Sequence, residues 1–390
     1  MKITLMPSAF APSVGGVEEL TRQLGLQLVA NGHDVEVWTS RRDGDNWLPR
    51  DVVDGLPVIR STFPAPKSHL LTMAKLGVRA PKELLRLRRE IQRFQPDVLH
   101  VQCFSSNGAY ATALSRLTDT PLVITLQGET MMDDHNVFEH SEFLRRALRH
   151  AMRRADAVTA CSQFTLDDAI TRFGLEDGKG QVIFNGVDLD EPGSEAMDLP
   201  FPRFVLAMGR VAQKKGFDLL LHAWKHVCSE VEGIGLVIGG DGRELPALRR
   251  LVEDLALQDR VHFTGPMGRG NVAWAMRQCD VFVMPSRLEP FGIVVLEAWR
   301  AGAPVIASSR GGAPEFVADS ATGLVVDPFD TPALTCTLLR LLTSTELRAN
   351  LAAAGGDRVR DFQWREITAQ YERVYTSVIP RRDMAARGAA

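Results

Sequence analysis

The sequence of 390 residues lacks the features that mark several broad classes of protein. Its 45 Lys and Arg residues nearly balance its 48 Asp and Glu residues, so no strong net charge predicts binding to nucleic acid or to a membrane. No apolar run approaches the roughly 18 residues of a membrane-spanning helix, and the first one, 3–6, is too short for a signal-peptide core. The five cysteines are scattered and form no Cys-x-x-Cys pair, which indicates reduced thiols and a cytoplasmic protein.

Familiar catalytic motifs are missing as well. The chain has no G-x-x-x-x-G-K-[ST] phosphate loop, no G-x-S-x-G and no H-E-x-x-H. The stretch 233–240 fails as a dinucleotide-binding fingerprint because Ile238 stands where the third glycine belongs. Asp188 and Asp190 imitate a metal-binding Asp-x-Asp pair, but their segment has the composition of a linker. The missing fingerprint argues against an NAD-dependent dehydrogenase.

The sequence does contain a regular alternation of apolar, β-branched runs with helical patterns. Continuous apolar runs such as 121–126 are typical of parallel strands that helices cover on both faces. Thirteen such runs are too many for one ordinary sheet. The predicted strands are 2–7, 34–40, 57–61, 98–103, 121–127, 157–162, 181–187, 203–209, 234–239, 261–265, 281–286, 304–308 and 323–327.

A stretch with proline, glycine and acidic residues divides these strands into two groups. We therefore predict an α/β protein with two Rossmann-like, doubly wound domains that face each other across a cleft. The predicted parts are a first domain at 1–190, a linker at 191–202, a second domain at 203–363, a helix at 364–378 and a tail at 379–390. Ligands of such sheets bind beyond the carboxyl ends of the strands.

Two cations follow the predicted strand 203–209. Arg210 and Lys215 flank a turn that Gly216 closes. At the carboxyl end of a strand, two such cations can neutralise a diphosphate, and arginine can do so with two parallel hydrogen bonds. The alternative is a pair of solvated loop charges.

Two acidic residues eight positions apart form the second motif. Glu289 precedes a glycine-containing turn, and Glu297 lies inside the helix predicted to start near Gly292. Eight residues of helical rise span about 12 Å, comparable to the reach from a sugar across two phosphates to a ribose. The free amides of Gly292, Ile293 and Val294 would then face the phosphates. The alternative is one helix with ordinary acids, although Glu297 lies among apolar residues, where a charge needs a partner.

Together the segments G-R-V-A-Q-K-K-G at 209–216 and E-P-F-G-I-V-V-L-E-A at 289–298 resemble the signature of glycosyltransferase family 4. Members of that family are retaining enzymes with the GT-B fold that use nucleotide sugars. Further matching pieces follow the family's order over about residues 1–375. They are P-S-V-G-G-V-E-E at 12–19, F-N-G-V-D at 184–188, G-G-D-G at 239–242 and S-R-G-G-A-P-E-F-V at 309–317.

The resemblance implies roles for the matching residues. Arg210 and Lys215 would clamp the leaving diphosphate and Glu289 would hold the hexose, so these three are expected to be catalytic. Glu297 would bind the ribose. The expected donor-binding residues are Gly15, Gly16, Arg210, Lys215, Gly265, Met267, Glu289, Phe291, Gly292, Ile293, Val294 and Glu297. Because two cations would stabilise the leaving group, we expect no essential metal and no cofactor beyond the donor.

One position departs from the family's pattern. Many members have His-Gly after the fifth strand of the first domain, whereas this chain has Gln127 there. Glutamine can hydrogen-bond a hexose hydroxyl but cannot titrate. Any step that relies on a protein imidazole at this place is therefore in doubt.

An acidic stretch, 129–142, follows Gln127 where an acceptor would enter, and it contains five carboxylates and no Lys or Arg. Together with Gln127, we assign Glu129, Asp133 and Asp134 to the acceptor side, where their charge would favour a cationic or amino-bearing acceptor. The two histidines of the stretch also allow a metal site. A solvated acidic loop is the simpler alternative.

Two predicted helices, within 75–95 and at 143–156, combine an apolar stripe with a basic face. Such a helix can lie on an anionic membrane. A helix that packs its stripe on the core and leaves its arginines in solvent explains the pattern more simply.

We predict a retaining hexosyltransferase that moves a sugar from a nucleotide diphosphate sugar to a hydroxyl of a small-molecule, glycan or lipid acceptor. The family favours UDP sugars over GDP sugars. No nucleic-acid partner is expected. Two alternatives stay open: a sugar-nucleotide epimerase on the same fold, and a protein that binds nucleotide sugars without turnover.

Overall fold

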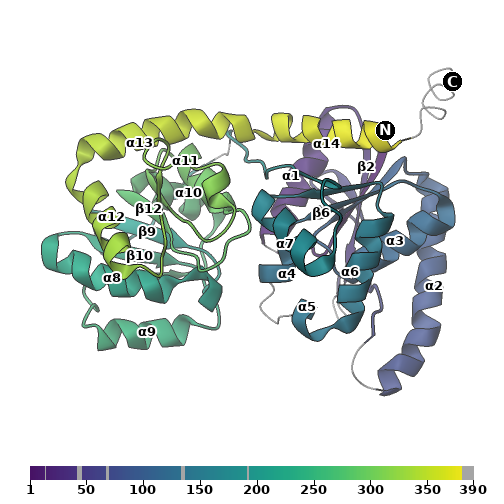
Figure 1. The fold of residues 1–390 in the computed structure, drawn as a ribbon, viewed down its shortest axis with the longest axis horizontal. Coiled ribbons are helices and arrows are strands. Elements are labelled where there is room, and N and C mark those ends of the chain that lie inside the picture. The colour runs from purple at the N-terminus through teal and green to yellow at the C-terminus, as the bar shows by residue number, and fades with distance from the viewer. Residues whose placement is uncertain (14, 42–45, 67–69, 133–136, 191–192, 380–390) are drawn as a thin grey trace. The chain divides into compact units, whose positions relative to one another are not determined.

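A computed structural model describes residues 1–13, 15–41, 46–66, 70–132, 137–190 and 193–379 (Figure 1). The backbone forms two compact units. Unit 1 consists of Met1–Asn185 together with the chain from Trp364 onward, and unit 2 consists of Gly186–Gln363. The helix predicted at 364–378 therefore belongs to unit 1, and residues 193–202 of the predicted linker belong to unit 2. Each unit has its own sheet, so the predicted α/β class is confirmed.

The sheet of unit 1 has the strand order β3-β4-β2-β1-β5-β6-β7-β8. Its neighbours pair in parallel, except that β3 is antiparallel to β4. The chain therefore builds outward from β1 in two directions, and a switch point lies between β1 and β5. The strands are β1 (Lys2–Pro7), β2 (Asp34–Ser40), β3 (Arg50–Val53), β4 (Leu56–Ser61), β5 (Val98–Gln102), β6 (Leu122–Leu126), β7 (Ala157–Ala160) and β8 (Gly180–Val182).

Strand β3 is absent from the sequence-based prediction. It is joined to β4 by Asp54 and Gly55, which both adopt positive φ angles of 49° and 84°. A two-residue Asp-Gly turn is a strong hairpin signal because both central residues of such a turn need positive φ. The signal was therefore present in the sequence, next to a strand too short and too exposed to show an apolar run.

Helices connect the strands of unit 1, and hydroxyl side chains mark where two of them begin. Ser141 Oγ accepts the Leu144 N–H at 3.2 Å, and Ser162 Oγ accepts the Thr165 N–H at 3.1 Å, as N-caps do. The helices are α1 (Gly16–Ala30), α2 (Leu70–Phe94), α3 (Ser106–Thr118), α4 (Glu129–Met132), α5 (Val137–His140), α6 (Glu142–Arg154), α7 (Gln163–Phe173) and α14 (Trp364–Val378).

The sheet of unit 2 is parallel throughout and has the order β11-β10-β9-β12-β13-β14, with its switch point between β9 and β12. The strands are β9 (Phe204–Met208), β10 (Gly235–Gly239), β11 (Val261–Gly265), β12 (Val281–Met284), β13 (Val305–Ser308) and β14 (Leu324–Val326). The α-helices are α8 (Phe217–Glu230), α9 (Leu245–Asp254), α10 (Arg269–Gln278), α11 (Ile293–Arg300), α12 (Thr331–Thr343) and α13 (Thr345–Arg358). Three short 3₁₀ helices are η1 (Gln213–Lys215), η2 (Ala313–Glu315) and η3 (Val359–Phe362).

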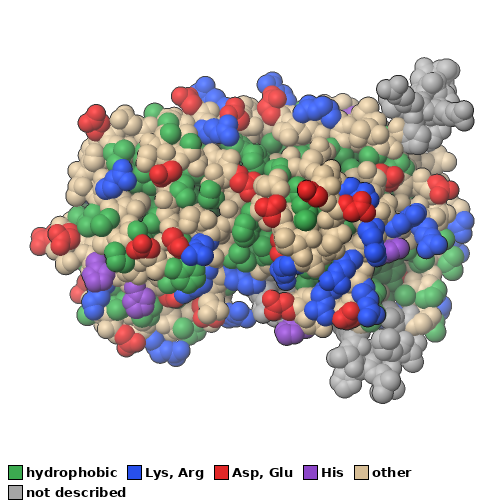
Figure 2. Space-filling view, in the orientation of Figure 1, with side chains coloured by type: hydrophobic (Ala, Val, Ile, Leu, Met, Phe, Trp, Pro, Cys, Tyr) green, Lys and Arg blue, Asp and Glu red, His purple; other side chains and the backbone are tan. Residues whose placement is uncertain are grey.

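Helix α6 packs its apolar stripe on the core of unit 1. Leu144, Leu148, Ala151 and Met152 are buried, whereas Phe143, which belongs to the predicted stripe, is exposed. Lys and Arg side chains gather on the surface over α6 (Figure 2). Among the described residues, no helix is long and apolar enough to cross a membrane. All five cysteines are free.

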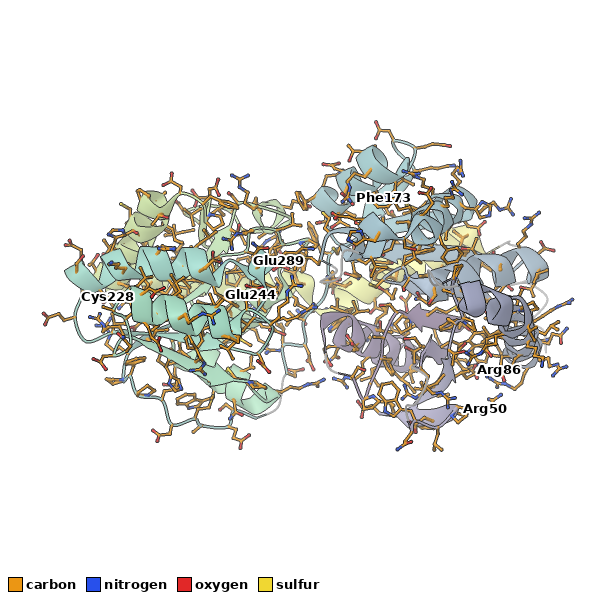
Figure 3. All side chains as sticks on the ribbon, turned by 90° about the horizontal axis from the view of Figure 1, so that it is seen from below. Arg50, Arg86, Phe173, Cys228, Glu244 and Glu289 are labelled. Atoms are coloured by element: carbon orange, nitrogen blue, oxygen red, sulfur yellow. The ribbon has the colours of Figure 1, made fainter. Side chains whose placement is uncertain are left out.

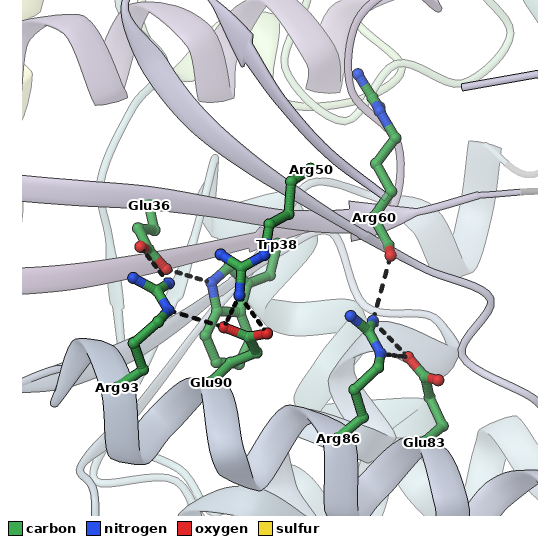
Figure 4. Close-up of polar contacts among 8 residues, drawn as sticks. All are labelled: Glu36, Trp38, Arg50, Arg60, Glu83, Arg86, Glu90 and Arg93. Carbon is green, nitrogen blue, oxygen red and sulfur yellow. Dashed lines mark hydrogen bonds and ion pairs between the residues drawn. The ribbon is translucent and has the colours of Figure 1, made fainter. Parts of the chain in front are cut away.

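An ion-pair network with two buried carboxylates and two exposed arginines attaches α2 to the sheet of unit 1 (Figure 4). Glu90 accepts bonds from Arg50 at 2.5 and 2.6 Å and from Arg93 at 2.9 Å. Arg93 also donates to Glu36, whose other oxygen accepts the Trp38 indole N–H at 3.0 Å. Burial alone would raise the pKa of Glu90, but its bonds to the two arginines lower it. The network connects β2 and β3 to a helix that covers the sheet.

Candidate functional site

The switch point of unit 2 brings two loops together: 209–216 after β9 and 285–292 after β12. Because β9 and β12 are neighbours in a parallel sheet, both loops leave from the same edge. The crevice at such a point is where sheets of this kind bind ligands. Most residues predicted to bind the donor lie in these loops or directly beside them.

Close backbone contacts hold the loop that carries Arg210. The Gly209 N–H donates to Gly239 O at 3.0 Å, and the Val211 N–H donates to Asp241 O at 2.8 Å. A Cβ at Gly240 would lie 2.0 Å from Gly209 O, a distance that no side chain can tolerate. The G-G-D-G motif therefore acts as a support for the backbone on both sides of Arg210, whose side chain is exposed.

The structure places Lys215 and Glu289 in direct contact. Lys215 Nζ lies 2.5 Å from Glu289 Oε2, although the residues are 74 positions apart. Their side chains are only 18% and 10% exposed. Gly216, at a φ of 68°, allows the approach because a Cβ there would lie 2.0 Å from Pro285 O. Glu289 is labelled in Figure 3, with Glu244 from the neighbouring loop.

A second ion pair fixes the loop between these residues. The terminal nitrogens Nη1 and Nη2 of Arg287 each donate to the Asp218 carboxylate at 2.6 Å, and Nη1 also donates to Gln213 O at 2.9 Å. Burial would raise the pKa of Asp218, but the hydrogen bonds and charge of Arg287 lower it. Arg287 thus connects the loop after β12 to η1 and α8, and sequence analysis did not identify this role.

Helix α11 begins at Ile293, one residue after the predicted start. Gly292 precedes it at a φ of 95°, with Met284 Sδ 2.8 Å from where a Cβ would lie. The predicted 12 Å of helical rise between Glu289 and Glu297 is wrong, because Glu289 lies in the loop. Only four residues separate Ile293 from Glu297, about 6 Å of rise.

Helix α11 presents one face that is not fully buried. Ile293, Val294 and Glu297 are half-buried there, and the opposite face, including Val295 and Leu296, packs in the core. The first-turn amides have no partner within the helix, so they point out of its start on the side of the Glu289 loop. Glu297 lies about one turn along from this end.

Three further predicted donor residues border this area. The Phe291 ring is buried 4.7 Å from the Phe316 ring, so only the backbone of Phe291 remains for a ligand. Gly265 O accepts the Gly240 N–H at 2.8 Å. Met267 packs its sulfur against Gly239, 2.5 Å from where a Cβ would lie. Gly265 and Met267 therefore lie behind the loop that carries Arg210.

In unit 1, Gly15 precedes α1 and Gly16 is its first residue. Both are exposed, and the φ of 179° at Gly15 is extended backbone that any residue adopts. A Cβ at Gly16 would meet nothing within 4 Å. Within the described residues, nothing in the backbone therefore requires glycine at either position, and their predicted approach to phosphate stays a prediction.

Glu129 binds the backbone of two loops at the carboxyl edge of unit 1. Its Oε1 accepts the Phe104 N–H at 2.6 Å, and its Oε2 accepts the Gln127 N–H at 2.7 Å. Burial raises the pKa of Glu129 to about 7, although these backbone bonds work against the shift. Glu129 therefore serves in this structure as a connection between the loops after β5 and β6.

Gln127 belongs to a chain of polar side chains that sequence analysis missed. Asn185 Nδ2 donates to Gln127 Oε1 at 3.0 Å, and Gln127 Nε2 donates to Gln102 Oε1 at 3.2 Å. Gln102 Nε2 lies 3.2 Å from His100 Nε2, and His100 Nδ1 lies 2.6 Å from the Tyr375 hydroxyl of α14. Burial lowers the pKa of His100 to about 3. The amides of Asn185 and Gln102, with the neutral imidazole of His100 behind Gln102, therefore fix the orientation of Gln127.

Asp133 and Asp134 lie outside the described residues. Among the residues that the structure does describe, no group of three or more His, Cys, Asp or Glu could hold a metal ion.

Comparison with known proteins gives matches over both units. Residues 14–191 match Glycosyltransferase Family 4, and residues 200–358 match the family Glycosyl transferases group 1. The D-inositol 3-phosphate glycosyltransferase of Xylanimonas cellulosilytica is 31% identical over 399 residues, which cover 94% of this chain and 93% of that protein.

Two solved structures share the fold along nearly the full chain. The sucrose-phosphate synthase of Thermosynechococcus elongatus has a TM-score of 0.80 at 24% identity, covering 96% of this chain and 98% of its own. HepE of Anabaena, solved in complex with UDP-glucose, has a TM-score of 0.74 at 20% identity, covering 97% and 100%.

The environment of Glu129 predicts an unusual pH dependence of stability. Between pH 4.5 and about 7 the folded protein holds a proton that the unfolded chain has lost. The wild type should therefore lose stability relative to Glu129→Gln as pH rises through this window, by at most about 1.4 kcal/mol per pH unit. Urea denaturation of both proteins at pH 5, 6, 7 and 8 measures the difference.

The contributions of Glu129 and His100 to the free energy of unfolding change in opposite directions as pH rises. A histidine with a depressed pKa stabilises the fold increasingly as pH rises to its ordinary value near 6.5, so subtracting the variant cancels its contribution. Glu139→Gln, which alters an exposed carboxylate of α5, serves as the control. Parallel pH profiles for the wild type and Glu129→Gln would contradict the prediction.

Proposed function

The chain belongs to glycosyltransferase family 4 and has the GT-B fold, and we propose that it is a retaining, metal-independent hexosyltransferase. It moves a hexosyl group from a nucleotide diphosphate sugar, with a UDP sugar favoured over a GDP sugar, to an acceptor hydroxyl. The contact between Lys215 and Glu289 is the observation that supports this best. It brings a lysine ammonium and a carboxylate together at the switch point of unit 2, which supports binding of the leaving diphosphate by Lys215 and of the hexose by Glu289.

The donor fits the chemistry of this edge. Arg210 and Lys215 supply positive charge for the diphosphate, and the first-turn amides of α11 add donors for a phosphate oxygen. Glu289 accepts hydrogen bonds from hexose hydroxyls, and Glu297, about one turn into α11, accepts them from the ribose. UDP is favoured by the family, and HepE, which shares the fold, binds UDP-glucose.

The transfer step needs no titrating side chain at Gln127. The acceptor oxygen attacks the anomeric carbon on the face that the diphosphate leaves, so a carbon–oxygen bond forms as another breaks. The acceptor proton passes to an oxygen of the leaving phosphate. Arg210 and Lys215 stabilise the negative charge that develops there. A sugar-nucleotide epimerase would need acid and base groups at the sugar, and an amide at Gln127 supplies neither.

One prediction of this proposal concerns Lys215, which with Arg210 should bind the diphosphate. Lys215→Met should lower kcat by about 100- to 1000-fold, the range seen when one donor to a developing oxyanion is removed. It should also abolish the thermal shift that the matching donor gives in a panel of UDP and GDP sugars. Lys225→Met, which alters an exposed lysine of α8, should behave as the wild type. A wild type that no nucleotide sugar stabilises contradicts the proposal.

The second prediction concerns metal ions. Because two side-chain cations neutralise the leaving group, transfer should continue at an unchanged rate in the presence of EDTA. The assay compares EDTA-treated enzyme with and without added Mg²⁺. Loss of transfer with EDTA, and its recovery with Mg²⁺, would overturn metal independence.

The third prediction concerns the acceptor, which we propose to be cationic or amino-bearing. Asp133→Asn with Asp134→Asn should raise the acceptor KM by about 3- to 10-fold, as expected for lost local attraction, and leave the donor KM unchanged. Asp177→Asn, an exposed acid of the same unit, is the control. Equal changes in both KM values would count against the cationic acceptor.

A further inference from the structure

Two buried hydroxyl groups lie behind Glu289. Ser286 and Ser308 are 0% and 1% exposed, at the ends of β12 and β13. Ser286 Oγ donates to Glu289 Oε2 at 3.0 Å. Ser308 Oγ donates to Ser286 O at 2.6 Å and accepts the Arg310 N–H at 3.0 Å. The two serines thus form a relay from the loop after β13 to the carboxylate.

The relay acts on one oxygen of Glu289. Oε2 accepts from both Ser286 and Lys215. Within the described part of the chain, Oε1 accepts no hydrogen bond, and it is not enclosed. The carboxylate is therefore held at one corner, and its other corner is available to a ligand.

The backbone of Glu289 is fixed from the same side. Its N–H donates to Arg310 O at 3.0 Å, and its carbonyl accepts the Gly312 N–H at 2.9 Å. A Cβ at Gly311 would lie 1.9 Å from Glu289 O, so glycine is required there. Because hydrogen bonds hold the main chain of Glu289 on both sides, its carboxylate can move mainly by side-chain rotation, and the bond from Ser286 restrains that rotation.

We propose that Ser286, supported by Ser308, is a positioning residue that aims Glu289 Oε1 at the hexose of the donor. The inference rests on the proposed function and extends it to the discrimination between a nucleotide sugar and the bare nucleoside diphosphate. Without Ser286, Lys215 alone would orient the carboxylate. Lys215 and Glu289 could then move together, and Glu289 Oε1 would no longer be held toward the sugar.

The test compares two ligands that differ only in the sugar. Calorimetric titration with UDP and with UDP-glucose, or with GDP and GDP-mannose if that pair binds the wild type more tightly, gives the ratio of the two Kd values. Ser286→Ala should reduce the sugar's contribution to this ratio by about 3- to 10-fold, within the range for a typical hydrogen bond. The Kd of the nucleoside diphosphate should stay within about 2-fold.

Three further variants complete the experiment. Ser308→Ala should shift the ratio in the same direction by a smaller factor, and it also serves if Ser286→Ala does not fold. Ser286→Thr keeps the hydroxyl and should restore sugar binding. Thr335→Val removes a buried hydroxyl of unit 2 that bonds to Thr331 O and lies on α12, so it should leave the ratio unchanged.

The outcomes separate the inference from the proposed function. If Ser286→Ala weakens both ligands equally, or leaves the sugar's contribution intact, the positioning role is overturned and the transferase proposal stands. The same holds if Thr335→Val changes the ratio as much as Ser286→Ala does. A wild type that binds neither nucleoside diphosphates nor nucleotide sugars overturns the proposed function, and the inference fails with it.

Discussion

The contact between Lys215 and Glu289 constrains the rest of unit 2. Two opposite charges, each mostly removed from water, stabilise one another and would be costly if either stood alone. Keeping them together requires two loops from neighbouring strands to approach at backbone distance. Gly216 allows that approach, and Gly311 lets a third loop, the one after β13, pack against the backbone of Glu289. Under the proposed function, the diphosphate of the donor would bind the ammonium of Lys215, and the hexose would bind Oε1 of Glu289 while Oε2 keeps its present partners.

The same requirement explains why glycines lie around the site in groups. Gly240 and Gly242 pack against the loop of Arg210, where a Cβ on either residue would lie 2.0 or 2.3 Å from a carbonyl oxygen of that loop. Any Cβ there would push the loop outward and move Arg210 away from its neighbours. Gly15 and Gly16, by contrast, meet no such backbone contact. Steric crowding by backbone therefore explains Gly240 and Gly242, and it does not explain Gly15 and Gly16.

Sequence patterns predicted the strands because each buried strand is a continuous apolar run, and every predicted strand overlaps an observed one. They missed β3, which is short and half-exposed. The pairing of Lys215 with Glu289 was implied only through their expected roles, since residues 74 positions apart meet only when the sheet forms. The chain from Tyr375 to Gln127 could not be predicted, because its members are separated by up to 275 positions. Glu129 was expected to face an acceptor, yet its local sequence gave no sign that two backbone amides would occupy it.

His100 and Tyr371, which lie near Gln127 in the core of unit 1, cannot act as acids or bases at physiological pH. Burial lowers the pKa of His100 to about 3 and raises that of Tyr371 to about 12, so both stay neutral at physiological pH. Gln127 itself carries no proton that it can exchange. Burial, by contrast, raises the pKa of Glu129 to about 7, and its carboxylate holds the backbone N–H groups of Phe104 and Gln127. Protonation of Glu129 near neutral pH would weaken the bond that its carboxylate accepts from the backbone of Gln127, and it would thereby loosen the loops at this edge.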